Sequence, residues 1–336
     1  MAAFLAKRLG WGLAVLFSVG VLTFVLARLV PADPASFLAG QNASTETVER
    51  IRSELGLDRP APEQFLSYFT GILRGDLGQS IRTGRPVAED LAQFLPATLE
   101  LMIAGFFLYM LISFGLALLA LRKPDGMLDK SVRLVTMLGT GIPVFWLGMG
   151  LQFIFFYKLG WLPLSSRFPV REIAPAGPTG FLLIDTLVAG NLRGFGLALQ
   201  HLCLPALTIV MNLLAVGTRL TRSTLLDERE QPYVRTALGK GLTRRSILLK
   251  HMLRNAANPI LVTTSMQFGY LISWILMVEV IFEWPGIGLY AYKSFQLFDY
   301  APVIALALVS TAGFVIINLA VDLIQPLIDP RIRKST

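Results

Sequence analysis

Residues 98–121 read TLELMIAGFFLYMLISFGLALLAL, and this apolar run decides the class of protein to which the chain belongs. A helix needs about 20 mainly apolar residues to cross the roughly 30 Å hydrocarbon layer of a membrane. The run is long enough, and it lacks the alternation of apolar and polar residues that marks a membrane β-strand. It therefore predicts a membrane-spanning helix.

Other blocks of the same kind make the chain a polytopic membrane protein. They cover about 9–30, 132–157, 202–221, 260–282 and 302–325. Of the 336 residues, 54% are hydrophobic and 15% are charged, whereas a soluble domain carries roughly 25% charged residues. We expect an all-α membrane protein with six transmembrane helices. The first block is about twice as long as the apolar region of a signal peptide, and no clean cleavage site follows it, so we expect it to be retained.

The distribution of charge predicts the orientation of these spans. The polar segments expected on one side hold Lys7 and Arg8, the basic residues of 122–133, the cluster of 219–254 and the basic C-terminus. The long segment 31–97 falls on the other side and holds six Arg against nine Asp or Glu. Short cytoplasmic loops collect Lys and Arg. Both termini are therefore expected in the cytoplasm, and the net charge of +8 reflects topology rather than nucleic-acid binding.

The loops divide a single predicted permease domain, residues 1–336, into functional segments. Residues 31–97 form an outer segment, 158–200 a second outer loop and 222–258 a cytoplasmic loop. The outer segment contains STETVERIRSELG, which predicts a helix capped by Ser44 or Thr45 and ended by Gly56, and PEQFLSYFTGIL, which has apolar residues at helical spacing. These amphipathic helices are expected to pack on the ends of the spans, to dock a soluble partner, or to do both.

The third block contains helix-breaking residues. Gly139, Gly141 and Pro143 lie within five positions, in LGTGIPVFWLG, beside Trp146. A membrane helix can bend or unwind only where protein or a water-filled cavity satisfies the freed backbone groups. These residues are therefore predicted to lie near a translocation pathway, although Gly and Pro are also common in ordinary membrane helices.

Ionisable residues in or beside the spans are candidates for function. Arg28 and Glu100 lie near the ends of spans, so their side chains are expected to reach the interface. Asp322 lies near the cytoplasmic end of the last span. Glu279 lies within a turn of the outer end of the fifth span and is read either as a structural hydrogen-bond partner or as a pathway residue.

Motifs for catalysis or metal binding are absent from the sequence. It contains no phosphate-binding loop, dinucleotide fingerprint, zinc-binding H-E-x-x-H, paired cysteines or G-x-S-x-G nucleophile motif. His201 and His251 are predicted at opposite faces of the membrane, and Cys203 is the single cysteine. We expect no catalytic site, metal site or cofactor on this chain.

The cytoplasmic loop contains YVRTALGKGLTRRSILLKHMLRNAANPI, residues 233–260, with six Lys or Arg and no acidic residue. Pro232 suits the first turn of a short helix and Gly241 its end, and Thr243 can cap a second helix. Tyr233, Val234, Ala237 and Leu238 form one small apolar face. Such a helix either plugs a groove on another protein or lies on anionic lipid.

At this point the residues carry a resemblance. The loop, with its Y-V-R-T-A-x-x-K-G-L pattern, resembles the "EAA" coupling loop of ABC importer permeases of the dipeptide/oligopeptide (peptide/nickel) family, specifically the first-type (B-type) subunit. Seven other segments also match this family, and they lie in the expected order along the chain: LVPADPA, RGDLGQSI, IPVFWLG, LGWLPLSSR, HLCLPALT, FEWPGIG and VDLIQPLIDPRIR. The general loop motif has Glu and Ala where this chain has Arg235 and Thr236, a variation that peptide-type permeases share.

The resemblance implies a type I ABC importer permease fold in a bacterial inner membrane and a mechanism. Two permease chains form the pathway, and each inserts a coupling helix into a cleft of a cytoplasmic ATPase subunit, which binds ATP and Mg. A soluble extracytoplasmic protein delivers the substrate. The residues implied in ATPase coupling are Tyr233, Val234, Arg235, Ala237, Gly241 and Leu242.

The substrate and two other classes of function stay open at this stage. The same architecture carries di- and oligopeptides, nickel complexes and other small polar solutes. A secondary peptide transporter that works without an ATPase is the alternative from another class. A membrane-embedded enzyme would need a reactive constellation that the sequence lacks.

Overall fold

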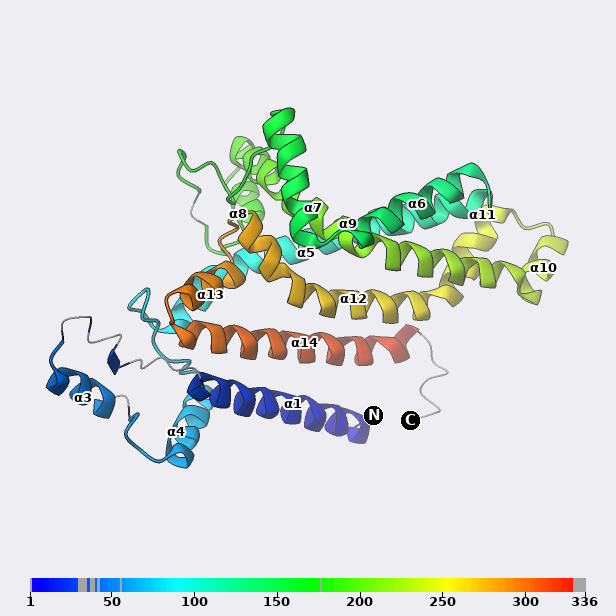
Figure 1. The fold of residues 1–336 in the computed structure, drawn as a ribbon. Helices are drawn as coiled ribbons and strands as arrows, with labels where there is room; N and C mark the ends of the chain where they lie inside the picture. Colours follow the sequence, from blue (N-terminus) through cyan, green and yellow to red (C-terminus); the bar gives the residue numbers. More distant parts are fainter. Residues whose placement is uncertain are drawn as a thin grey trace. The chain divides into compact units, whose positions relative to one another are not determined.

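The computed structural model of the chain describes residues 2–29, 35–36, 40, 43–54, 56–175 and 177–328. Its α-helices are α1 (Ala2–Leu29), α3 (Thr45–Glu54), α4 (Ala61–Leu73), α5 (Val87–Arg122), α6 (Met127–Gly141), α7 (Val144–Leu151), α8 (Leu182–Val188), α9 (Leu192–Glu230), α10 (Pro232–Gly239), α11 (Arg244–Ile247), α12 (Leu253–Ile281), α13 (Ile287–Gln296) and α14 (Tyr300–Ile328) (Figure 1). Two π-helical segments, η1 (Gln152–Lys158) and η2 (Leu248–Met252), continue α7 and precede α12. The described ranges contain no β-strand, only an isolated bridge between Gln79 and Pro86.

The predicted all-α membrane architecture is confirmed. Over the described residues, five helical segments are long and apolar enough to span a membrane: Ala6–Leu26, Val87–Arg122, Leu192–Glu230, Arg244–Ile281 and Tyr300–Leu323. A sixth candidate is the pair Met127–Gly139 and Val144–Lys158, which is bent by 105°.

The bend in this third span has a local cause. Ile142 is extended, with φ −99° and ψ 127°, and Pro143 follows with φ −56°. The proline ring disfavours helical dihedrals at the residue before it, and proline itself cannot donate a backbone hydrogen bond. Helix α6 therefore ends at Gly141 and α7 begins at Val144, so the predicted break is confirmed.

Helix α9 is longer than the apolar block that predicted it. The block covers 202–221, whereas the helix runs from Leu192 to Glu230. At 1.5 Å per residue its 39 residues measure about 58 Å, well beyond the hydrocarbon thickness. Asn191 begins the helix, because its Oδ1 accepts a hydrogen bond of 2.8 Å from the backbone N–H of Gly194. The helix thus takes in the ends of both predicted flanking loops, since its hydrogen bonds do not require apolar side chains.

The described chain groups into two compact units, which are treated separately. The first comprises Ala97–Trp284 together with α14 from Ile316 onward. Its buried core is drawn mainly from α5, α7, α9 and α12, and includes Leu101, Tyr109, Leu147, Leu204, Val210, Leu271, Val278, Phe282 and Trp284. The prediction of one permease domain is not decided by this grouping and stays a prediction.

The second unit comprises Ala2–Pro96 and Pro285–Val315. In it, α4 packs on α1 through aromatic rings. Phe17 and Phe69 meet edge to face at 5.3 Å between centroids, and Phe24 and Phe65 do so at 5.2 Å. Of the two alternatives for this predicted amphipathic helix, packing on a span is the one observed for α4.

The other predicted helix of the long outer segment is α3. Ser44 caps it, because its Oγ accepts a hydrogen bond of 3.2 Å from the backbone N–H of Thr47. Gly56 follows the helix with φ +63°, a conformation that favours glycine. The predicted start and end signals are therefore both present.

Candidate functional site: the loop between α9 and α12

The short helix α10 begins and ends at the residues that predicted it. Gln231 is extended, with ψ 145°, and Pro232 occupies the first helical position, where its missing N–H costs no hydrogen bond. Beyond the other end, Gly241 has φ +78°, and the N–H of Leu242 donates to the carbonyl of Ala237 at 3.2 Å. No atom lies within 4 Å of a Cβ built on Gly241. Glycine is therefore required here by the backbone and not by packing.

One face of α10 is buried within the chain. Val234 and Ala237 are 4% and 7% exposed and belong to a cluster with Leu225 of α9, Ile247 and Met252. This cluster lies where α9, α10, α11 and η2 meet. The packing identifies Val234 and Ala237 as the residues that seat the helix, and their role in coupling stays a prediction.

Most of the rest of the surface of α10 is exposed within this unit. Its exposed residues are Arg235, Thr236, Leu238, Gly239 and Lys240, and Leu238 keeps 47% of its surface exposed. Leu242, just beyond the helix, is 40% exposed. The surface left for a partner is thus a leucine bordered by basic and small side chains.

Tyr233 ties α10 to the end of α9. Its hydroxyl donates to the carboxylate of Glu228, and Asn255 of α12 is a second hydrogen-bond partner. Burial raises the pKa of Tyr233, and the hydrogen bond to Glu228 raises it further, while Asn255 acts in the opposite direction. The phenol therefore stays neutral as a donor. Tyr233, the first residue of the recognised pattern, acts inside the chain as an anchor.

The second helix of the loop begins as expected. The Oγ1 of Thr243 accepts a hydrogen bond of 3.3 Å from the backbone N–H of Ser246. Only Leu242 and Thr243 separate the turn at Gly241 from α11, which leads through η2 into the predicted fifth span. The loop therefore contains little chain outside helices.

The predicted pathway residues differ in their burial. A Cβ on Gly139 would collide with the carbonyl oxygen of Met211, so this glycine allows α6 to approach α9 closely. Gly141, Pro143 and Trp146 are exposed, Trp146 by 62%. Their role near a pathway stays a prediction.

Glu279 is fully buried near the end of α12. Its Oε1 accepts a hydrogen bond of 2.6 Å from Oγ1 of Thr98 on α5. Nearby in sequence, the indole N–H of Trp284 donates to the carbonyl of Ala97 at 2.8 Å. Of the two interpretations left open for Glu279, a structural hydrogen-bond role is the one with an observed partner.

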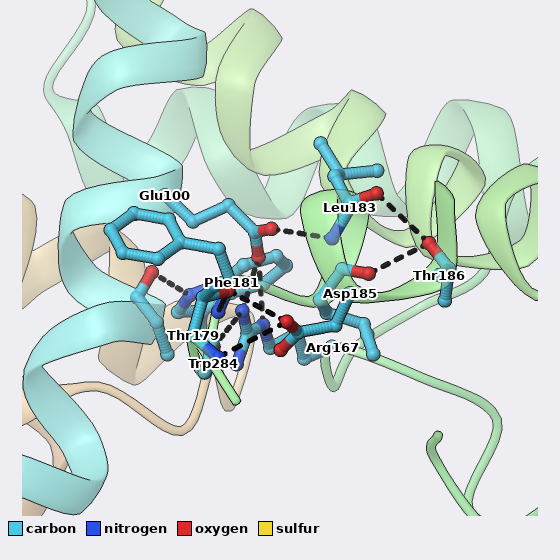
Figure 2. A network of polar contacts seen from close by, with 11 residues as sticks. Glu100, Arg167, Thr179, Phe181, Leu183, Asp185, Thr186 and Trp284 are labelled. Carbon is cyan, nitrogen blue, oxygen red and sulfur yellow. Dashed lines mark hydrogen bonds and ion pairs between the residues drawn. The ribbon is translucent and has the colours of Figure 1, made fainter. Parts of the chain in front are cut away.

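A polar network around Glu100 was not predicted. Figure 2 shows its carboxylate facing the guanidinium of Arg167 and the backbone of Leu183. Glu100 is 5% exposed, so the expectation that it extends to the interface is wrong. The side chain of Arg28 lies outside the described residues. Arg167 sits in the predicted second outer loop, 67 positions away, and no local pattern signals that pairing.

The same network closes on the short helix α8. Arg167 also donates to the carbonyl of Gly180 at 2.8 Å, and Asp185 accepts from both the N–H and the hydroxyl of Thr179 (Figure 2). The segment before α8 is thereby fastened to α5 by buried charged groups. This part of the predicted loop is ordered by its own side chains.

Comparison with known proteins agrees with the sequence and the geometry. Residues 112–334 match the sequence profile of the family described as "Binding-protein-dependent transport system inner membrane component", and residues 1–102 match the profile of its N-terminal part.

Three similar proteins extend over almost the whole chain. The "Probable D,D-dipeptide transport system permease protein DdpB" of Escherichia coli (strain K12) is 42% identical over 326 residues, covering 97% of this chain and 96% of that protein. The "Di/tripeptide transport system permease protein DppB" of Pseudomonas aeruginosa is 37% identical and covers 100% of both chains. The "Glutathione transport system permease protein GsiC" of Pectobacterium atrosepticum is 34% identical and covers 99% of both. With its apolar helices, this chain belongs to the family of inner membrane components of binding-protein-dependent transport systems and is a multi-pass protein of the inner membrane.

Proposed function

We propose that this chain is one of two permease subunits of an ATP-driven importer whose substrates are short peptides. Full-length similarity to permeases named for D,D-dipeptides and for di- and tripeptides supports this substrate class. The relative named for glutathione also carries a small peptide. A soluble binding protein outside the membrane delivers the substrate, as the family description implies for binding-protein-dependent systems.

The observation that carries the coupling to an ATPase is the two-sided character of α10. Its inner face, Val234 and Ala237, is buried against the chain, while Leu238 is exposed among Arg235 and Lys240. An eight-residue helix is marginal on its own. Here its seating supplies the missing stability and holds the outer face in a fixed direction, so the helix can fill a cleft on a cytoplasmic partner.

ATP and its Mg ion belong to that partner in this proposal. The sequence has no phosphate-binding loop of the G-x-x-x-x-G-K-[ST] type. Closure of two ATPase subunits around ATP displaces the coupling helices, and the permease pair then changes the side of the membrane to which its pathway opens. In this proposal the chain converts that displacement into the change of its pathway and does not itself hydrolyse ATP.

The polarity of a peptide substrate is the reason for proposing a second permease chain. A zwitterionic peptide loses several kcal/mol per unsatisfied polar group when it enters hydrocarbon. A polar route between two permeases avoids that loss. Gly141, Pro143 and Trp146, exposed at the break in the third span, are the residues that we place beside this route.

The first test is recovery of partners through a tag on this chain in mild detergent. An ATPase and a second permease are expected to accompany the unsubstituted protein. Leu238→Ala should reduce ATPase recovery about tenfold, which corresponds to the ~1.4 kcal/mol of a single well-packed interface side chain. Leu249→Ala is the matched control, because Leu249 is 52% exposed in the same loop but outside α10. Equal loss from both variants would argue for adsorption on lipid instead of a cleft.

The second test is uptake of labelled dialanine into membrane vesicles. Uptake should require ATP and should continue when a protonophore collapses the proton gradient. Uptake that persists without ATP and stops when the proton gradient collapses would favour the secondary-transporter alternative. Uptake of labelled nickel complexes in place of dialanine would favour the other substrate class.

A further inference from the structure

A buried ion pair joins α6 to α9 near the coupling loop. Both guanidinium nitrogens Nε and Nη2 of Arg222 on α9 donate to the carboxylate of Asp129 on α6, at 2.6 Å each. The side chain of Asp129 is fully buried, and that of Arg222 is 16% exposed. A two-point pair of this geometry fixes orientation as well as distance.

The remaining hydrogen-bonding capacity of Asp129 is also used. Its Oδ2 accepts from the backbone N–H of Asp125 at 2.9 Å and from Nη2 of Arg133 at 3.0 Å. Arg133 is four residues further along α6, and its side chain is 47% exposed. Arg133 therefore stabilises the carboxylate from the same helix, whereas Arg222 alone connects it to α9.

A second contact holds α6 to α9 further along both helices. The backbone of Gly139 approaches the carbonyl of Met211 so closely that a Cβ would not fit. Position 139 is ten residues after Asp129, and position 211 is eleven residues before Arg222. The two helices thus run antiparallel and are attached at two points more than two turns apart, as the neighbouring ribbons of α6 and α9 illustrate (Figure 1). Helix α6 must therefore follow α9.

Helix α9 is in turn connected almost directly to the coupling helix. Gln231 is the only residue between α9 and α10, and Tyr233 hydrogen-bonds back to Glu228 of α9. A displacement of α10 is therefore passed to α9 with little slack.

The far end of α6 is the break at Ile142 and Pro143. Beyond it, α7 packs against both α9 and α12. A Cβ on Gly148 would lie 3.1 Å from Ile281, and Nε2 of Gln152 donates to the carbonyl of Ile281 at 3.1 Å. The two halves of the third span therefore differ in their attachments, because α6 packs on α9, whereas α7 packs on both α9 and α12.

We infer that the Asp129–Arg222 pair is the link by which displacement of the coupling helix reaches the broken third span. Helix α9 carries α6 with it, and the extended residue Ile142 absorbs the resulting change of angle between α6 and α7. Asp129 and Arg222 are positioning residues in this inference, which rests on the proposed coupling of α10 to an ATPase.

The test compares two arginine variants in the complete transporter, purified through a tag on this chain. Arg222→Gln and Arg133→Gln each remove one positive charge that contacts Asp129, but only the first cuts the connection between helices. Arg222→Gln is expected to lower dialanine uptake per ATP hydrolysed roughly tenfold, within the usual range of coupling between sites. Arg133→Gln should stay close to the unsubstituted transporter, and both should retain the ATPase.

A distance measurement separates this role from a loss of stability. Spin labels attached to cysteines introduced at Met137 of α6 and Met149 of α7, both at least 50% exposed, report the angle across the break. The labelled variants also carry Cys203→Ser, so that the native cysteine is not labelled. Trapping the transporter with ATP and vanadate should change this distance in the unsubstituted chain and in Arg133→Gln, but not in folded Arg222→Gln.

The outcomes distinguish the link from the function on which it rests. If the ATPase accompanies the chain and Arg222→Gln retains both the distance change and normal uptake per ATP, the link is refuted and the proposed function stands. If no ATPase accompanies the unsubstituted chain, the proposed function is refuted and the link with it.

Discussion

Arg167 donates two hydrogen bonds to one oxygen of Glu100, from Nε at 2.8 Å and from Nη2 at 2.5 Å, while the other oxygen accepts from the N–H of Leu183 at 2.7 Å. The two side chains are only 16% and 6% exposed. Three donors on one buried carboxylate join a loop, the helix α8 and the span α5. The Glu100–Arg167 ion pair is therefore expected to hold the predicted second outer loop in place, and substituting either residue tests this.

Glu100→Gln should destabilise the protein strongly. It leaves the charge of Arg167 buried without a counter-ion, and removing one partner of a buried pair typically costs 3–5 kcal/mol. We expect about 3 kcal/mol, the lower end, because Arg167 keeps some contact with solvent. Denaturant titration in detergent, followed by tryptophan fluorescence, measures the change. Arg193→Gln is the control: its pair with Glu172 is exposed and should contribute less than about 1 kcal/mol. Equal effects would contradict the prediction.

Gly139→Ala should separate α6 from α9. The added methyl group would meet the carbonyl of Met211, and relief of such overpacking typically costs 1–3 kcal/mol. Gly141→Ala, two residues on, is the matched control, because nothing lies within 4 Å of its Cβ position. Thermal unfolding followed by circular dichroism compares the two. A less stable Gly141→Ala than Gly139→Ala would show that the close approach is not what matters.

Gly241→Val should disturb the end of α10 without touching a neighbour. A left-handed backbone costs a residue with a Cβ about 1–2 kcal/mol, and asparagine tolerates it better than a β-branched residue. Recovery of the ATPase should therefore fall for Gly241→Val and be largely kept by Gly241→Asn. Unchanged recovery with the valine variant would mean that the turn at φ +78° is not needed for coupling.

Tyr290 should make the stability of its unit sensitive to alkali. Burial raises the pKa of Tyr290 most, a hydrogen bond with Ser80 lowers it by less, and the hydrogen bond to Asp90 and the charges of Asp90 and Asp299 raise it further. Its hydroxyl donates to Asp90 at 2.7 Å. The unfolded chain ionises near pH ~10, before the folded one. The contribution to the free energy of unfolding is therefore present below about pH 10 and is lost as the pH rises toward the folded pKa.

Tyr290→Phe checks this sign. The variant should lose about 1–2 kcal/mol at neutral pH, because Asp90 loses a donor, but its stability should decline less steeply above about pH 10. Tyr157→Phe serves as the control, since Tyr157 is 70% exposed. Parallel alkaline declines in the unsubstituted chain and Tyr290→Phe would contradict the assignment.

Local signals in the sequence predicted local structure well. The apolar runs located the spans, Pro143 the break in the third, and Pro232 with Gly241 the limits of α10. Each of these features is decided by residues within one or two turns, because backbone dihedrals and hydrogen bonding act at that range. The span ends were less accurate, since hydropathy does not limit a helix such as α9.

Pairings across the fold could not be predicted in the same way. Glu100 and Arg167 are 67 positions apart, and Asp129 and Arg222 are 93 apart. One sequence shows that each is charged, but not which helix packs against which. For the same reason the sequence alone did not show that Val234 and Ala237 of α10 are buried against α9, α11 and η2.

The short connections around α10 have an evolutionary consequence. One residue separates it from α9, and four separate it from α11. Each inserted residue adds at most about 3.5 Å of chain, enough to let the helix shift before α9 moves. Selection should therefore conserve the number of residues from 230 to 244 more strictly than their identities, so descendants of this gene should carry substitutions there but neither insertions nor deletions.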